Sequence, residues 1–285
     1  MTDSAGIHEL GDRDGFAVVF HNGTPTSGLM PEWWDAPARE RGLRMIGIDR
    51  PGYGDAPAVP GRSLRSVAEL TGALMDELGV DRFALLGVSG GGPYALACAA
   101  FLPDGRVPAV ISAAAGSGFD EVLDGGSMEP EELALHREQA VRPTPEGRGT
   151  LARFYDPAIE EMRRADLDGF MRSVGQDPAQ STAEGREVAA YVLESIKDGI
   201  RPGRDGWLDD GLTMVRPWGF DPSDIRQPVA VWHSQDDPMV SIEHGRRLLA
   251  AIPNSEPILV DGLGHGGVCY RQEVPMMDWI ATTTS

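Results

Sequence analysis

A serine flanked by glycines, set between a strand-like run and a helix-like run, is the feature that most constrains how this chain can fold. The apolar run Phe83–Val88 leads into Gly87-Val-Ser89-Gly-Gly91, and a run of small residues follows at positions 94–101. A serine at a sharp strand-to-helix turn is held in a strained conformation with its hydroxyl exposed, and only glycine fits where the two backbones approach closely. The pattern predicts a strand, a tight turn and a helix, with Ser89 as a candidate nucleophile.

Two other glycine-rich turns between a strand and a helix bind nucleotides, and this sequence fits neither. A dinucleotide-binding turn needs Gly-x-Gly-x-x-Gly, whereas residues 87–92 read Gly-Val-Ser-Gly-Gly-Gly. The phosphate-binding pattern Gly-x-x-x-x-Gly-Lys-Ser/Thr does not occur in the chain. An ordinary turn with an incidental serine is the remaining alternative, so the interpretation of Ser89 depends on the partners that the rest of the chain offers.

Short apolar runs alternate with helical patterns in both ends of the chain. The runs are continuous rather than alternating in polarity, which is typical of parallel strands buried on both faces. We expect strands at residues 17–20, 45–48, 83–88, 107–115, 229–232 and 258–260. Helical spacing of apolar residues indicates helices at 64–78, with Ser66 and Glu69 as a predicted capping box, and at 94–101, 246–252 and 274–280. This alternation predicts an α/β fold with a mostly parallel, doubly wound sheet.

The pattern changes between residues 117 and 217. Strand-like runs are absent there, and charged helical segments at 130–141, 158–170 and 183–197 are separated by loops rich in glycine, proline and aspartate. We interpret 117–217 as a helical cap inserted into a core that is formed by 1–116 and 218–285.

Composition argues against several classes of function. The chain has 285 residues and a formal net charge of −19, which repels phosphate backbones and anionic lipids, so we expect neither a nucleic acid nor a membrane as a partner. No apolar stretch approaches the roughly 18 residues of a membrane span, and the N-terminal residues lack the pattern of a signal peptide. The two cysteines, Cys98 and Cys269, do not indicate a disulfide framework, a metal site or a cofactor. We expect a cytoplasmic protein.

The serine needs a base, because a hydroxyl is a poor nucleophile at neutral pH, and the base needs an orienting acid. His265 follows the apolar run 258–260, and the chain order serine, acid, histidine is typical of a Gly-x-Ser-x-Gly turn. We therefore predict His265 as the base. The other histidines compete less well: His136 and His244 fall on predicted helix surfaces, and His8 falls in a predicted frayed terminus.

The acid is expected on the loop after the apolar run 229–232, where Asp236 and Asp237 are adjacent. Loops after parallel strands meet at one edge of an open α/β sheet, which is where ligands bind. Only one of two neighbouring side chains can point inward, and we choose Asp237 because Asp-Pro starts a turn. Asp120, which follows the run 107–115, is the alternative acid.

An oxyanion hole needs two N–H donors. One is predicted at Gly90, directly after the candidate nucleophile. The other is predicted at Thr24, in the loop His21-Asn-Gly-Thr-Pro25 after the first strand-like run, where a glycine turn lets the Thr24 N–H face the site.

Together these motifs resemble those of the α/β-hydrolase superfamily, in particular its cap-bearing, single-domain members close to esterases and proline iminopeptidases. The motifs that carry the resemblance are His21-Asn-Gly-Thr-Pro25, Asp49-Arg-Pro-Gly-Tyr-Gly54, Gly87-Val-Ser-Gly-Gly-Gly-Pro93, Ser234-Gln-Asp-Asp237-Pro and Gly264-His265. The resemblance covers nearly the whole chain. It implies a Ser89–His265–Asp237 triad with Thr24 and Gly90 as the oxyanion hole, and it disfavours members that use an aspartate nucleophile, because position 89 is serine.

We therefore expect a serine hydrolase that cleaves a small carboxylic ester or lactone through an acyl-enzyme, without a cofactor or metal and as a monomer or homodimer. The alternatives are an aminopeptidase or iminopeptidase, a carbon–carbon bond hydrolase with the same triad, cofactor-free oxygen or perhydrolase chemistry, and a non-catalytic protein that binds a small ligand. An iminopeptidase would need an acidic partner for the ammonium group, for which Glu131, Glu132, Glu160 and Glu161 are available. An apolar substrate pocket is expected from Trp33, Trp34, Phe154, Tyr155, Phe170 and Trp218.

Overall fold

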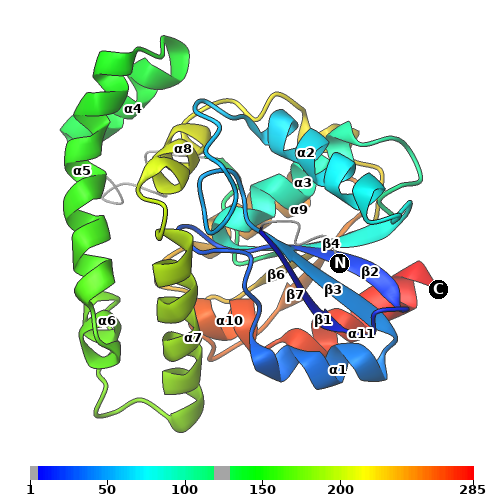
Figure 1. The fold of residues 1–285 in the computed structure, drawn as a ribbon. Helices are drawn as coiled ribbons and strands as arrows, with labels where there is room; N and C mark the ends of the chain where they lie inside the picture. Colours follow the sequence, from blue (N-terminus) through cyan, green and yellow to red (C-terminus); the bar gives the residue numbers. More distant parts are fainter. Residues whose placement is uncertain (1–5, 119–128) are drawn as a thin grey trace.

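The computed structural model describes residues 6–118 and 129–285, and its centre is a seven-stranded sheet in the order β1-β3-β2-β4-β5-β6-β7 (Figure 1). β1 pairs antiparallel with β3, and the other pairs are parallel. The strands are β1 (Ile7–Gly11), β2 (Phe16–His21), β3 (Leu43–Ile48), β4 (Phe83–Val88), β5 (Val110–Ala113), β6 (Val229–His233) and β7 (Ser255–Leu259). The predicted α/β fold with a mostly parallel sheet is confirmed.

Helices cover both faces of this sheet (Figure 1). One face packs on the helices α2 (Leu64–Glu77), α3 (Gly92–Phe101) and α9 (Ile242–Ala251). The other face packs on α1 (Asp35–Glu40), α10 (His265–Tyr270) and α11 (Glu273–Thr284). Short 3₁₀ turns lie at Glu32–Trp34, Ser89–Gly91 and Pro222–Asp224. Burial on both faces explains why the central strands are continuously apolar; every residue of β4 and of β6 is buried.

The first strand was missed by the sequence analysis. Residues Ile7–Gly11 form β1 at the edge of the sheet, so His8 lies in a strand and not in a frayed terminus. The capping box of α2 was also misplaced: it joins Ser63, the N-cap, to Ser66. β5 is shorter than predicted, and β7 begins earlier.

Five helices connect β5 to β6 within residues 129–228, and no strand occurs in that range. They are α4 (Pro130–Val141), α5 (Pro145–Arg164), α6 (Leu167–Ser173), α7 (Ala183–Gly199) and α8 (Asp205–Met214). Figure 1 shows α4, α5 and α6 as an outer arm, with α7 and α8 between that arm and the sheet. All five lie inside the stretch interpreted from the sequence as a cap.

These helices have small cores of their own. One gathers around Ile159, Phe170 and Leu193, and a second gathers around Tyr155 and Leu208. α7 also packs on the core of the sheet through Val188 and Tyr191.

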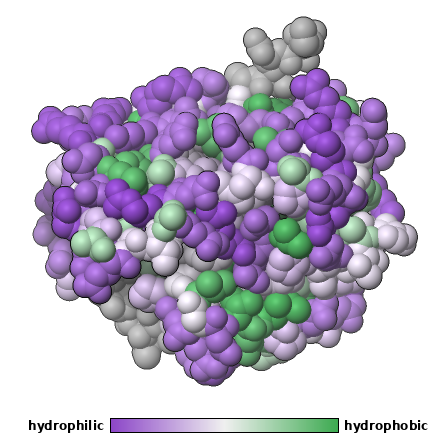
Figure 2. Space-filling model, turned by 90° about the horizontal axis from the view of Figure 1, so that it is seen from below, coloured by the Kyte–Doolittle hydropathy of each residue, from purple (hydrophilic) through white to green (hydrophobic). Residues whose placement is uncertain are grey.

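The face shown in Figure 2 is largely hydrophilic. The face in Figure 2 shows hydrophobic residues gathered in separate groups among hydrophilic ones. Among the described residues, no helix combines the length and the apolar character needed to cross a membrane.

Candidate active site

Ser89 lies at the sharp turn between β4 and α3, as its sequence pattern predicted. Its φ of 50° falls in the left-handed region, where a residue with a side chain is strained. The flanking glycines are required by close backbone contacts. A Cβ added at Gly91 would lie 1.9 Å from the carbonyl oxygen of His21, and one at Gly87 would lie 2.7 Å from that of Gly91. The turn therefore presents the Ser89 side chain at the carboxyl end of the central strand.

Asp237 and His265 meet at the same edge of the sheet. Asp237 Oδ2 accepts a hydrogen bond from His265 Nδ1 at 2.8 Å. The Asp237 side chain is fully buried, and its other oxygen accepts the N–H groups of Met239 and Val240, each at 2.9 Å. Burial raises the pKa of Asp237, but the contact with His265 and the two N–H groups outweigh it, and the net pKa is lowered. The carboxyl group is thus held in its charged form against the imidazole.

The neighbouring carboxyl groups point elsewhere or lie outside the described structure. Asp236 is exposed, and its Oδ2 accepts the N–H of Gly262 at 2.8 Å. It makes no contact with the imidazole of His265 among the described residues. Asp120, the alternative acid, lies outside the described residues. The geometry therefore favours Asp237 as the acid that orients the histidine.

The outer nitrogen of His265 faces a cysteine. His265 Nε2 lies 3.9 Å from Cys269 Sγ, one helical turn further along α10. Burial lowers the pKa of His265, but Cys269 and the Asp237 carboxylate raise it by more, so the net pKa is raised. Within residues 6–118 and 129–285, no hydrogen bond joins Ser89 Oγ to His265. The acid and the base are paired, and the contact between base and serine is not made in this conformation.

The two predicted oxyanion donors are in contact with each other beside Ser89. A Cβ added at Gly90 would lie 3.2 Å from the Thr24 nitrogen, and one at Gly23 would lie 3.3 Å from Cβ of Ser89. The N–H of Thr24 donates to no other backbone group in the described structure. Gly90 lies in the first turn of the helical segment that continues into α3, where N–H groups lack partners within the helix. The loop after β2 and the turn after β4 thus each place one backbone amide next to the serine.

A cavity of about 160 Å³ opens in front of Ser89. Its walls come from the turn after β4, from α8 and from the loop after β6. The lining is mainly apolar and consists of Thr24, Leu64, Ser89, Gly90, Pro93, Tyr94, Gly116, Gly118, Asp210, Thr213, Met214, Trp218, Met239, Val240 and His244. A cavity of this size holds a group about as large as benzene.

Of the six predicted substrate-binding aromatic residues, the structure brings Trp218 to this cavity. Trp33 and Trp34 instead donate their indole N–H groups to the carbonyl oxygen of Tyr270, at 3.1 and 3.2 Å. Trp34 is completely buried against Phe20. These two tryptophans fasten α10 to the core and do not line the cavity.

The cap aromatic residues also pack away from the cavity. Tyr155 donates its hydroxyl to His136 at 2.6 Å inside a small core, which Phe154 flanks. Phe170 belongs to the other cap core, with Ile159 and Leu193. The residues that the sequence analysis missed are the polar and aliphatic ones of α8 and of the loop after Asp237, because single threonines and methionines carry no local signal of a binding site.

The two histidines predicted to lie on helix surfaces are buried instead. His136 and His244 are 0% and 1% exposed, contrary to the sequence prediction. His244 Nδ1 accepts the N–H of Ser117 at 3.1 Å. His233 donates Nε2 to the carbonyl oxygen of Val240 at 2.9 Å, which holds the loop that carries Asp237. Cys98 and Cys269 are both buried and free, so they form no disulfide.

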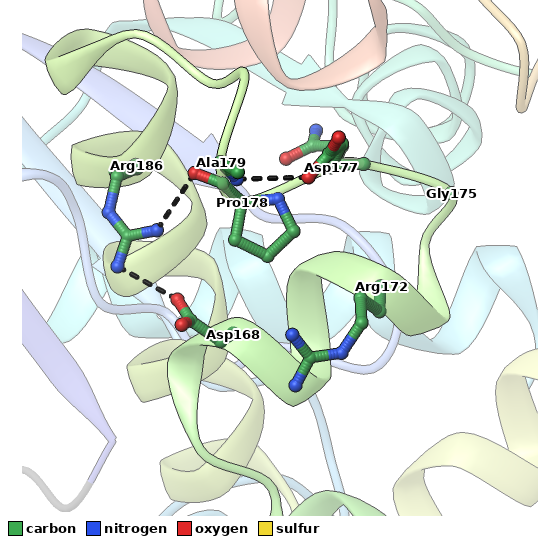
Figure 3. Close-up of a pocket in the computed structure, with 8 residues that line it drawn as sticks. Asp168, Arg172, Gly175, Asp177, Pro178, Ala179 and Arg186 are labelled. Atoms are coloured by element: carbon green, nitrogen blue, oxygen red, sulfur yellow. Dashed lines mark hydrogen bonds and ion pairs between the residues drawn. The ribbon is translucent and has the colours of Figure 1, made fainter.

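A second hollow, of about 610 Å³, lies in the cap between α6 and α7 (Figure 3). Arg186 pairs there with Asp168 at 2.8 Å, and Arg172 lies at its rim. None of the described residues that line it is a serine, cysteine or histidine. It offers neither a nucleophile nor a base, so the smaller cavity at Ser89 is the candidate active site.

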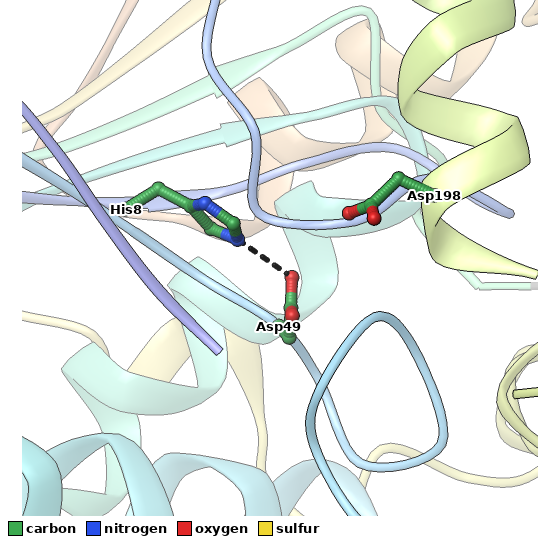
Figure 4. Close-up of side chains that lie close together, drawn as sticks. All are labelled: His8, Asp49 and Asp198. Carbon is green, nitrogen blue, oxygen red and sulfur yellow. Dashed lines mark hydrogen bonds and ion pairs between the residues drawn. The ribbon is translucent and has the colours of Figure 1, made fainter. Parts of the chain in front are cut away.

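Among the residues that the structure describes, His8, Asp49 and Asp198 form a group that could hold a metal ion (Figure 4). Asp49 already accepts His8 Nε2 at 3.1 Å, the N–H of Gly28 at 2.7 Å and the N–H of Asp55 at 2.9 Å. These bonds tie β1 to the turn after β3. These three residues therefore have a structural role. None of them is among the described residues that line the Ser89 cavity.

Comparison with known proteins identifies the family. Residues 17–269 match the alpha/beta hydrolase fold family, and the chain belongs to it. It is similar to a 2-hydroxy-6-oxononadienedioate/2-hydroxy-6-oxononatrienedioate hydrolase of Cupriavidus pinatubonensis, with 28% identity over 79% of this chain and 70% of that protein. The family match and this relative show that the protein is a hydrolase of the alpha/beta-hydrolase type.

Solved structures agree with this assignment of the fold. An esterase of Exiguobacterium antarcticum superimposes with a TM-score of 0.69 and 21% identity, covering 98% of this chain and 95% of that one. An esterase of Thermogutta terrifontis superimposes with a TM-score of 0.64 and 21% identity, covering 100% and 97%.

Proposed function

We propose that this protein is a serine hydrolase that cleaves a small, uncharged carboxylic ester or lactone through an acyl-enzyme on Ser89. The observation that carries the proposal is the 2.8 Å hydrogen bond between Asp237 and His265 at the edge of the sheet where the strained Ser89 turn ends. A buried acid that orients an imidazole, at the sheet edge where a half-buried serine ends the central strand, supports the arrangement that activates a hydroxyl.

The reaction follows from the three groups. His265 Nε2 removes the Ser89 proton as the serine oxygen attacks the carbonyl carbon, and Asp237 stabilises the imidazolium. The N–H groups of Thr24 and Gly90 bind the oxyanion. His265 then gives its proton to the leaving alkoxide, which departs as the alcohol. It next activates a water molecule that releases the acid and restores Ser89. Catalytic contacts often tighten only when substrate is bound, so the separated serine and histidine are compatible with this sequence.

The cavity supports a small and uncharged acyl group. Its volume is about 160 Å³, below the roughly 300 Å³ of common ligand sites. No lysine or arginine lines it among the described residues, and the sequence of residues 119–128 contains neither. Asp210, the acidic residue in the lining, is already paired with Arg50 and Arg62.

A carbon–carbon bond hydrolase is the second candidate, because the Cupriavidus pinatubonensis relative is named for a dioate substrate. A dioate carries two carboxylates, and their recognition calls for cations. A peptidase needs an acid in the cavity that is free to pair with an ammonium group, whereas none of the four candidate glutamates, Glu131, Glu132, Glu160 and Glu161, is among the described residues that line it. The lining thus supports the ester over both.

The test measures the turnover of p-nitrophenyl esters of increasing chain length by the wild type and by Ser89→Ala. Lactones, aminoacyl amides and a dienedioate are assayed as alternative substrates, one for each candidate function. We expect the highest kcat/KM on short esters or lactones and a loss of roughly four to six orders of magnitude in kcat for Ser89→Ala. Unchanged turnover in that variant excludes the proposal. Binding without turnover indicates a ligand-binding protein.

We also propose that the enzyme acts in the cytoplasm, as a monomer or homodimer on a small-molecule substrate. Two free buried cysteines and the acidic charge support this. Size-exclusion chromatography with light scattering and cell fractionation test it.

A further inference from the structure

Asp210, on the cap helix α8, lies at the centre of a buried polar cluster that reaches into the core of the sheet. Five side chains donate to its two oxygens: Thr24 Oγ1 at 2.5 Å, Arg50 at 2.8 Å, Tyr53 at 2.7 Å, Arg62 at 2.5 Å and Tyr94 at 2.6 Å. All of these donors belong to the core, whereas Asp210 belongs to the cap. The cluster is therefore a polar connection between the two parts at the edge of the cavity.

The charged side chains of the cluster are almost completely buried from solvent. Arg50, Arg62 and Asp210 are 2%, 3% and 2% exposed. Burying an ion pair costs desolvation energy, and apolar residues of similar volume often give equal or greater stability. A cluster of three buried charges next to Ser89 thus calls for a reason other than stability.

Arg50 also binds the loop that carries the predicted oxyanion donor. Its guanidinium donates to the carbonyl oxygens of Asn22 at 2.5 Å and Gly23 at 3.1 Å. Thr26 Oγ1 donates to the same Gly23 oxygen at 2.6 Å. The peptide bond between Gly23 and Thr24 is trans, and in a planar trans peptide the C=O and the N–H point in opposite directions. Fixing the Gly23 carbonyl on Arg50 therefore fixes the direction of the Thr24 N–H.

Thr24 is held from its side chain as well. Its hydroxyl donates to Asp210 at 2.5 Å and accepts from Arg50 at 3.3 Å. Asp210 in turn forms an ion pair with Arg50, the residue that donates to the Gly23 carbonyl oxygen. The backbone of Thr24 is thus clamped by one core arginine and one cap carboxylate, on the side where it contacts Gly90.

We propose that Arg50 and Asp210 are positioning residues that hold the Thr24 N–H in the oxyanion hole, so that docking of α8 onto the core completes the transition-state site. The inference rests on the proposed function, since it assigns the cluster a task in that reaction. It predicts that the cap contributes to kcat without touching the reacting atoms.

The positioning role makes a kinetic prediction that a purely structural role does not. The oxyanion exists only in the transition state, so a displaced donor lowers kcat and leaves KM nearly unchanged. Removing a whole oxyanion donor costs about 100-fold to 1,000-fold in kcat. We expect about 10-fold to 100-fold for Arg50→Lys and for Asp210→Asn, which displace the donor without deleting it. Lysine keeps the charge but cannot reach both carbonyls and Asp210 at once.

Asp209 provides a matched control on the same helix. It is buried, pairs with Arg148 at 2.6 Å and with Arg62 at 3.5 Å, and accepts the N–H of Gly61 at 3.0 Å. It thus touches the cluster only through Arg62, and among the described residues neither Asp209 nor Arg62 makes a hydrogen bond with the loop of Thr24. Asp209→Asn is expected to lower the Tm while kcat stays within about 3-fold of wild type. A kcat loss equal to that of Asp210→Asn would show that any damage to α8 slows the enzyme, and would overturn the proposal.

A milder pair of variants covers the case in which Asp210→Asn does not fold. Thr24→Val keeps the backbone N–H and removes the hydroxyl that Asp210 accepts, whereas Thr24→Ser restores the hydroxyl. We expect about a 10-fold loss of kcat in the valine variant and near wild-type kcat in the serine variant. Equal kcat in the two variants contradicts the proposal.

Two further readouts separate positioning from other damage. The inhibition constant of a trifluoromethyl ketone, whose serine adduct carries an oxyanion, should weaken in parallel with kcat/KM across the variants. The pH midpoint of kcat/KM should stay at its wild-type value, because His265 is untouched. If wild type is labelled on Ser89 by a fluorophosphonate but Arg50→Lys and Asp210→Asn retain kcat, this inference fails and the proposed function stands. If wild type is neither labelled nor active on any acyl substrate, both fail.

Discussion

Asp237 and His265 are 28 residues apart in the chain, and a hydrogen bond of 2.8 Å joins the carboxylate of one to the imidazole of the other. The parallel strands β6 and β7 bring them together, since Asp237 lies on the loop after β6 and His265 begins α10, the element that follows β7. The neighbouring Asp236 turns outward to the N–H of Gly262. The fold thus separates two adjacent carboxyl groups into different environments.

This separation predicts opposite outcomes for two conservative substitutions. Asp237→Asn should lower kcat by about 1,000-fold to 10,000-fold, because an amide cannot hold the imidazole in the required tautomer. Asp236→Asn changes the adjacent, exposed residue and should leave kcat within about 3-fold. Steady-state kinetics on a short p-nitrophenyl ester checks both. Comparable losses in the two variants would show that the acid has been misassigned.

The contact between Cys269 and His265 predicts a shift in the pH dependence. Cys269 raises the pKa of His265, and the base acts only when it is neutral, so activity rises as pH increases through that pKa. Cys269→Ala should move the acidic limb of kcat/KM to lower pH. Cys98→Ala is the control, because that buried cysteine contacts His21 instead. An unmoved limb in Cys269→Ala, or one moved upward, would argue against this coupling.

The cavity predicts control of acyl-chain length at Gly116. This glycine lines the cavity, and a Cβ added to it meets no atom within 4 Å. Gly116→Val should therefore fill the cavity without disturbing the core, and lower kcat/KM on a hexanoate ester at least 10-fold more than on an acetate ester. Gly149→Val, at an equally open position on α5, should leave kcat/KM unchanged on both esters. Equal losses on both esters at Gly116 would show that the acyl chain binds elsewhere.

His8 predicts a pH-dependent part of the stability. Burial lowers its pKa, but the hydrogen bond and charge of Asp49, with Asp198 and Asp55, raise it by more. A raised folded-state pKa gives stability that is complete below the unfolded value of about 6.5 and is lost as pH rises through the folded value.

His8→Gln should therefore cost about 1–2 kcal/mol at pH 5.5 and clearly less at pH 9. Urea unfolding of both proteins at the two pH values measures this difference. A loss that is the same at both pH values would mean that His8 acts through packing and not through its charge.

The central strands and the Ser89 turn could be predicted because their signals are local. Burial on both faces makes β4 a continuous apolar run, and close backbone contacts impose the glycines around Ser89. β1 could not be predicted in this way. It is short and of mixed polarity, and its strand character comes from pairing with β3 more than 30 residues away.

The polar and aromatic partners could not be predicted because tertiary packing decides them. From the sequence, Asp210 resembles a solvated residue on an acidic helix. Arg50, one of the two arginines that it binds, lies 160 positions away in the chain. Trp34 and Tyr155 read equally well as pocket or core, and contacts with Phe20 and His136 place them in the core. Of the aromatic residues predicted for the pocket, Trp218 lines the cavity, and Tyr94, which was not predicted, lines it as well.

The central claim is that Ser89 is an activated nucleophile, and covalent labelling tests it most directly. The wild-type protein would be treated with a fluorophosphonate, digested with trypsin and analysed by mass spectrometry, beside His265→Ala. The account predicts one adduct, on the peptide Phe83–Arg106, whose single serine is Ser89, and its near absence in His265→Ala. No adduct on Ser89 in the folded wild-type protein, or equal labelling with and without the imidazole, would contradict it.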